Sequence, residues 1–92
     1  MLFRSYTANT IKIDGLENNT IVRSAGASKA LPRIKLQAEG GQGKNYWFIN
    51  AHLKYSTSNN QAVFHQFKTA GRYQVTVIDD AGHSDSINLE VL

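Results

Sequence analysis

The alternation of apolar and polar residues in the last third of the chain constrains its fold more than any other feature. Apolar residues recur at every second position in residues 72–79 and again in residues 84–91, as in β-strands with one buried face. Asp80-Ala81-Gly82 joins the two segments, and Gly82 suits the left-handed position of a hairpin turn. The pattern therefore predicts a β-hairpin whose inner face consists of Tyr73, Val75, Val77, Ile87, Leu89 and Val91.

The rest of the chain repeats this pattern in shorter segments. We expect strands at residues 11–13, 20–23, 33–38, 46–50, 53–55 and 62–67, separated by turn-forming residues. No segment has a sustained helical period, and residues 24–32 are typical of a loop. A chain of 92 residues has room for one hydrophobic core. The sequence thus predicts one domain over residues 1–92, an all-β, immunoglobulin-like antiparallel β-sandwich of about seven strands, with a linker or loosely ordered arm at residues 1–9.

Trp47 lies in the middle of the most apolar of these segments. It is either a platform on which a ligand stacks or the core tryptophan of an immunoglobulin-like sandwich. Alternation puts Trp47 and Ile49 on one face of the strand and Tyr46 and Phe48 on the other. This arrangement favours the core for Trp47 and the outer surface for Tyr46 and Phe48.

Ala70-Gly71-Arg72-Tyr73 is typical of a tyrosine corner, in which the phenol bonds back to upstream backbone. We therefore expect a structural role for this segment. The predicted structural residues are Trp47, Ile49, Phe67, Gly71, Tyr73, Val75, Val77 and Gly82. The wider predicted core adds Ile34, Leu36, Ile87 and Leu89.

Residue types that carry chemistry are present but not in a reactive pattern. His83-Ser84-Asp85 has the residue types of a catalytic triad, yet neighbours on one strand point to opposite faces. Asp79 and Asp80 are candidates for calcium, but a hairpin carboxylate usually accepts hydrogen bonds from its own turn amides. The chain has no cysteine. We expect no catalytic residue, no metal site and no cofactor.

The net charge of +3 is unevenly distributed: all ten Lys and Arg lie in residues 1–72, and four of the seven acids lie in residues 73–92. The basic part either attracts an anionic polymer or consists of ordinary solvated strand faces. No segment is apolar enough for a signal peptide or a membrane helix. We expect a longer polypeptide upstream of Met1.

Two segments carry a family resemblance: Trp47-Phe48-Ile49-Asn50, and Phe67-x-x-x-Gly71-x-Tyr73-x-Val75-x-Val77-x-Asp79-x-x-Gly82-x-Ser84. Together with the strands near residues 11–13 and 34–38, they resemble the C-terminal domain of bacterial bifunctional penicillin-binding protein 1C, the BiPBP_C family. The resemblance covers nearly the whole chain. It implies a non-catalytic periplasmic module of an inner-membrane-anchored peptidoglycan synthase, whose glycosyltransferase and transpeptidase sites belong to upstream domains.

The resemblance implies as partners the upstream domains of the parent chain, another cell-wall protein or peptidoglycan. It implies neither nucleic acid nor direct membrane insertion, and we expect the isolated domain to be a monomer. Two alternatives remain open from the residues. In the first alternative, the chain is an immunoglobulin-like module of a secreted glycan-degrading enzyme or adhesin. In the second, it is a purely structural spacer.

The candidate contact residues surround the outward face of the tryptophan strand. Tyr46 and Phe48 project from this face, Tyr55 follows a few residues later, and Lys44 and Lys54 are close in sequence. Aromatic residues edged by positive charge suit a partner protein or a glycan that carries acidic peptides. The alternative is that a neighbouring loop or residues 2–6 cover these rings.

Overall fold

The computed structural model describes residues 11–23 and 31–92. The expected arm at residues 1–9, the possible cover of residues 2–6 and most of the loop at residues 24–32 lie outside the described residues. Within the described part, the chain forms nine strands. None of it is a helix long and apolar enough to cross a membrane.

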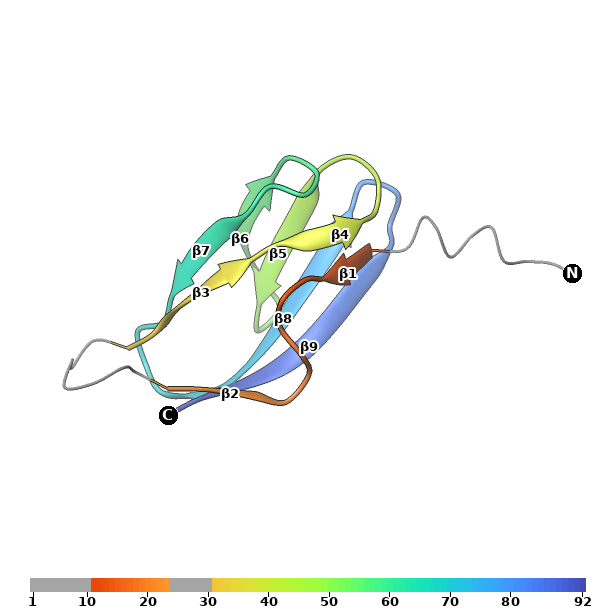
Figure 1. Cartoon of the computed structure of the whole chain (residues 1–92). Helices are drawn as coiled ribbons and strands as arrows, with labels where there is room; N and C mark the ends of the chain where they lie inside the picture. Colours follow the sequence, from red (N-terminus) through yellow and green to blue (C-terminus); the bar gives the residue numbers. More distant parts are fainter. Residues whose placement is uncertain (1–10, 24–30) are drawn as a thin grey trace, which may run out of the picture.

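The strands form two layers that face each other across the core (Figure 1). The larger layer is a five-stranded sheet in the order β2-β9-β8-β5-β6. Its strands are β2 (Thr20–Val22), β5 (Asn45–Ile49), β6 (His52–Thr57), β8 (Gly71–Asp79) and β9 (Ser84–Val91).

The smaller layer consists of two strand pairs, β1 with β4 and β3 with β7. Their bounds are β1 (Ile11–Ile13), β3 (Arg33–Leu36), β4 (Ala38–Gly40) and β7 (Val63–Gln66). The predicted all-β, immunoglobulin-like sandwich is confirmed in this arrangement.

Three details differ from the sequence expectations. The predicted strand at residues 33–38 is interrupted at Gln37, because β3 pairs with β7 whereas β4 pairs with β1. The predicted strand at residues 53–55 extends over His52–Thr57. The sandwich is not wholly antiparallel, since β2 pairs with β9 in parallel. The chain does not reverse in a hairpin between β1 and β2, and β2 lies beside β9 with both strands running in the same direction (Figure 1).

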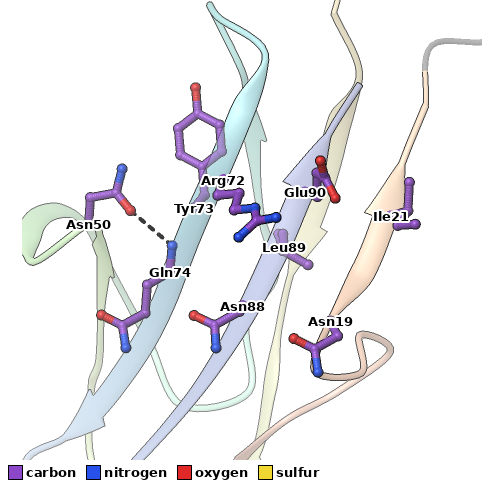
Figure 2. Close-up of a pocket in the computed structure, with 9 residues that line it drawn as sticks. All are labelled: Asn19, Ile21, Asn50, Arg72, Tyr73, Gln74, Asn88, Leu89 and Glu90. Carbon is purple, nitrogen blue, oxygen red and sulfur yellow. Dashed lines mark hydrogen bonds between the residues drawn. The ribbon is translucent and has the colours of Figure 1, made fainter.

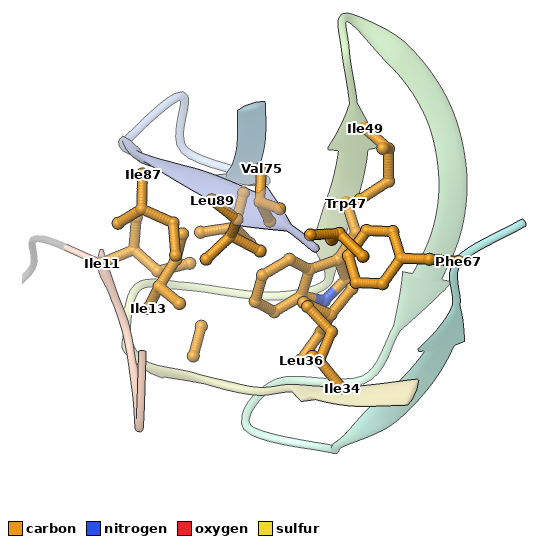
Figure 3. Packing of buried hydrophobic residues seen from close by; sticks show 13 residues of the cluster. Ile11, Ile13, Ile34, Leu36, Trp47, Ile49, Phe67, Val75, Ile87 and Leu89 are labelled. Carbon is orange, nitrogen blue, oxygen red and sulfur yellow. The ribbon is translucent and has the colours of Figure 1, made fainter. Parts of the chain in front are cut away.

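The core fills the space between the layers, with Trp47 at its centre and fully buried (Figure 3). Every predicted core residue is buried except Tyr73, which is half-buried, and Gly71 and Gly82, which are exposed. The buried apolar residues are Ile11, Ile13, Ile34, Leu36, Ala38, Trp47, Ile49, Phe67, Val75, Val77, Ile87, Leu89 and Val91. Alternation therefore predicted which side chains face inward.

The tyrosine corner forms as expected. The Tyr73 hydroxyl donates to the Thr69 carbonyl oxygen at 2.6 Å, and the two side-chain hydroxyls lie 2.7 Å apart. Gly71 and Gly82 are exposed rather than part of the core. Their φ angles of 141° and 89° are conformations that glycine adopts without strain. These glycines are therefore structural through the backbone and not through packing.

The turn between β5 and β6 places two non-glycine residues in the left-handed region. Asn50 has a φ of 51° and Ala51 a φ of 68°, as in the two-residue turns that match the twist of a hairpin. The Asn50 amide donates to the Gln74 carbonyl, and the Gln74 amide donates to Asn50 Oδ1, both at 2.9 Å. These two bonds fix the turn against β8.

Replacing Trp47 with alanine removes the largest fully buried side chain. We expect the Trp47→Ala variant to lose roughly 3–5 kcal/mol of unfolding free energy, which is a large share of the stability of a small domain. Urea denaturation followed by circular dichroism measures the loss. A variant that unfolds at the same urea concentration as the parent would contradict the core position of Trp47.

Replacing Ala51 with glycine relieves the strain of a side chain at positive φ. We expect Ala51→Gly to raise the unfolding free energy by roughly 0.5–1 kcal/mol. This is a net value, because the entropy that glycine adds to the unfolded chain offsets part of the relieved strain. Thermal denaturation of the variant beside the exposed, extended-strand control Ser86→Gly measures the change. If Ala51→Gly is destabilising, the turn is not left-handed at this position.

Candidate functional site

The outer face of the five-stranded sheet carries the candidate site. Cross-strand register orders its side chains into rows that run from β6 towards β2. The first row is Ser56, Tyr46, Ile78 and Ser84, and the second is Leu53, Phe48, Thr76 and Ser86. Side chains in neighbouring rows are two residues apart along β5 and β8, so they share this face. Along β6 they are three residues apart, because the register shifts there by one residue.

Tyr46 is half-buried at one end of this face. Its hydroxyl donates to Asp80 Oδ1 at 2.8 Å, and the Lys44 amide donates to Asp80 Oδ2 at 2.8 Å. The hydrogen bond with Asp80 raises the pKa of Tyr46, with smaller contributions from burial and the Asp80 charge. The bonds from Lys44 and Tyr46 lower the pKa of Asp80. Tyr46 thus holds the β8–β9 turn with its hydroxyl.

Phe48 and Leu53 form an apolar contact surface in the second row. They are direct cross-strand partners, and Thr76 is the partner of Phe48 on the other side. Phe48 is half-buried, whereas Leu53 is 58% exposed. The core needs neither side chain, since both point away from Trp47. Apolar side chains gathered on the outer face of a sheet are a feature of recognition surfaces.

Tyr55 does not join Tyr46 and Phe48. The register between β5 and β6 shifts after Trp47, and Lys54 is the extra residue, so Tyr55 pairs with Trp47 and shares its inner face. The Tyr55 hydroxyl is hydrogen-bonded to His65 Nδ1 at 2.7 Å, which joins the open edges of the two layers. Burial, and then the Lys54 charge, lowers the pKa of His65. The expected grouping of Tyr55 with Tyr46 and Phe48 is therefore wrong.

Lys44 and Lys54 are both exposed. An aromatic ring edged by positive charge also occurs on the smaller layer. There Phe64 is 54% exposed, and the Arg33 guanidinium lies 5.1 Å from the centre of its ring. Lys35 is the cross-strand partner of Phe64. Arg33 thus covers this ring in a cation–π contact.

The Asp79 carboxylate accepts hydrogen bonds from the loops at the same end of the sandwich. Its carboxylate is 3% exposed and accepts from the Gln42, Ala81 and His83 amides at 2.8–3.0 Å. Its Oδ2 also lies 3.0 Å from His83 Nδ1. Burial alone would raise the pKa of Asp79, but the bonds from the His83 ring and the backbone amides together lower it.

These contacts account for the residues that looked reactive in the sequence. His83 contacts Asp79 rather than Asp85. Asp85 accepts from the Ile13 amide at 2.9 Å and so ties β1 to β9. Asp79 accepts from its own turn amides, as expected of a hairpin carboxylate. Over residues 11–23 and 31–92, no group of three or more His, Cys, Asp or Glu side chains is arranged to hold a metal ion.

A depression of about 570 Å³ lies on the same outer face, towards β2 (Figure 2). Its lining residues are Asn19, Ile21, Asn50, Arg72, Tyr73, Gln74, Asn88, Leu89 and Glu90. None of them is among the contact residues predicted from the sequence. The one local signal is Asn88, a residue disfavoured in strands that stands in the middle of β9.

The Asp79 carboxylate makes the stability of the domain depend on pH. A lowered pKa in the folded state contributes stability above the unfolded value of about 3.9, and this stability is lost as the pH falls through the folded pKa. We expect Asp79→Asn to cost roughly 1.5–3 kcal/mol near pH 7 and much less near pH 2. Urea denaturation of both proteins at the two pH values measures the difference. An equal cost at both pH values would contradict the role of the charge.

Comparisons with known proteins agree with this fold. The model of the Penicillin-Binding Protein C-terminus Family matches residues 1–89. A comparison with curated proteins finds no match. A solved structure of a fibronectin(III)-like module of Clostridium thermocellum CbhA is similar in fold, with a TM-score of 0.63 at 12% identity over 89% of this chain and 95% of that one. The sandwich and the family match over nearly all of its length together show that this chain belongs to the Penicillin-Binding Protein C-terminus Family.

Proposed function

We propose that this domain is a non-catalytic binding module of a bifunctional peptidoglycan synthase, and that the outer face of its five-stranded sheet contacts a partner, which is peptidoglycan, another cell-wall protein or the upstream domains of the same synthase. Penicillin-binding proteins are proteins of the cell envelope, and the family supports a place at the C-terminal end of such a protein. We place the module in the periplasm, as part of a protein anchored in the inner membrane.

The apolar pair of Phe48 and Leu53 carries this proposal. Both residues are on the outer face of the five-stranded sheet, and Leu53 is among the most exposed large apolar residues described. Keeping an aromatic ring and a leucine on a solvent-facing surface does nothing for the core. Aromatic side chains at such positions are enriched in recognition surfaces.

The contacts of the ionisable residues support a role without catalysis. The His83 ring contacts Asp79, the His65 ring is bonded to Tyr55, and Asp85 is bonded to the Ile13 amide. None of these three pairs joins a nucleophile to a base that is oriented by a third group, which covalent catalysis requires. Binding is therefore the function that the described residues support best.

Phe48→Ser combined with Leu53→Ser tests the proposal. The isolated domain is titrated by NMR with the upstream domains of its parent protein and, separately, with soluble peptidoglycan fragments. We expect chemical-shift changes centred on Phe48 and Leu53 with at least one ligand, and a dissociation constant raised roughly tenfold in the double variant.

Phe64→Ser is the matched control, because Phe64 is about as exposed as Leu53 but lies on the smaller layer. It should leave binding unchanged. Shifts confined to β3 and β7, or the absence of shifts with both ligands, would contradict the proposal, and the second result is what a purely structural spacer would give.

A further inference from the structure

The row next to Phe48 on the outer face consists of side-chain amides. Gln74 and Asn88 are direct cross-strand partners on β8 and β9. Asn50 is bonded to the backbone of Gln74 on one side, and the Asn19 amide donates to the Asn88 carbonyl on the other at 2.7 Å. Gln74, Asn88 and Asn19 thus present their amides side by side across the depression, and the Asn50 amide lies next to the Gln74 backbone at one end of them (Figure 2).

These amides are available to a ligand. The Asn50 Oδ1 accepts from the Gln74 backbone amide, so the NH₂ group of Asn50 remains available. The Asn88 backbone amide donates to Asn18 Oδ1, and this bond does not involve the Asn88 side chain. Gln74, Asn88 and Asn19 make no side-chain hydrogen bond to another described residue, and all three are exposed. Each amide offers both donors and an acceptor.

The charges in the depression offset each other. Arg72 and Glu90 are cross-strand partners in the next row, and they are the only charged residues among the lining residues. Because one positive and one negative group stand side by side, the surface has no net charge to attract a polyanion or a strongly acidic peptide. This balance favours an uncharged ligand that is rich in hydrogen-bonding groups.

Apolar side chains border the amide row on both sides. Ile21 is 53% exposed and pairs with Glu90 on one side, while the Phe48 ring lies in the row on the other side. A sugar ring presents this combination of surfaces: polar groups at its rim and an apolar face that packs on an aromatic ring. An acetamido substituent adds a carbonyl, an N–H and a methyl group that match amides beside an apolar residue.

We propose that the amide row formed by Asn19, Asn50, Gln74 and Asn88 binds a glycan strand through its N-acetylated sugars. This inference rests on the proposed function and specifies its ligand as the glycan part of peptidoglycan. The strand lies across β8 and β9, with one sugar ring against Phe48 and acetamido groups at the amides. The depression of about 570 Å³ is within the range of small-molecule sites, roughly 300–1,000 Å³.

Two oligosaccharides with the same linkage test the inference on the 92-residue chain. Chitohexaose has an acetamido group on each sugar, and cellohexaose has none. We expect millimolar chitohexaose to shift the NMR signals of Gln74, Asn88 and Phe48, and cellohexaose to bind several-fold more weakly. We expect Asn88→Ala and Gln74→Ala each to weaken chitohexaose binding about three- to tenfold.

Asn59→Ala is the matched control, since Asn59 is an exposed amide residue in the loop between β6 and β7. It should bind chitohexaose like the parent, and thermal denaturation should show all three variants folded. Equal binding of both oligosaccharides, no shift with chitohexaose, or binding that neither amide variant changes would overturn the inference. If the upstream domains nevertheless bind at Phe48 and Leu53, the proposed function stands and only the glycan site fails.

Discussion

The burial of Trp47 between the two layers is the constraint on which the rest of this structure depends. The domain is small enough to have one core, and this indole is its largest fully buried side chain. Once Trp47 faces inward, strand geometry sends Ile49 inward and Tyr46 and Phe48 outward. The same side chain therefore stabilises the sandwich and determines which residues of β5 are presented to a partner. Because β5 lies inside the five-stranded sheet, its outward residues are flanked by those of β6 and β8.

The two ends of the sandwich are held by different chemistry. At one end, the Asp79 and Asp80 carboxylates accept hydrogen bonds from backbone amides of the loop before β5 and of the β8–β9 turn. At the other end, the Tyr73 hydroxyl and the Asn50 turn fix the start of β8. Both ends are thus held by hydrogen bonds, some within one turn and others between residues 24 to 37 positions apart in the sequence. Between them, the outer face of the sheet keeps Phe48 and Leu53 out of the core, which suits a surface that binds a ligand.

Much of the fold was predictable because its signals are local. A period of two identifies the strands and their inner faces, and the tyrosine corner and the Gly82 turn follow from a few adjacent residues. The errors arise where the partner of a strand matters. The extra residue at Lys54 turns Tyr55 to the inner face, and the change of partner at Gln37 divides one expected strand into two. The amide row is likewise a product of cross-strand register, since Asn19 and Asn88 become neighbours only through the parallel pairing of β2 with β9.

We propose that the outer face of the five-stranded sheet, and not the smaller layer, contacts the cell wall. Hydroxyl-radical footprinting of the 92-residue chain with and without purified peptidoglycan sacculi tests it most directly. Phe48 and Phe64 are the natural reporters, because their rings lie on the outer faces of the two opposite layers. We expect sacculi to protect Phe48 and the neighbouring Leu53 from oxidation and to leave Phe64 unchanged. Protection of Phe64 with no change at Phe48 would contradict it.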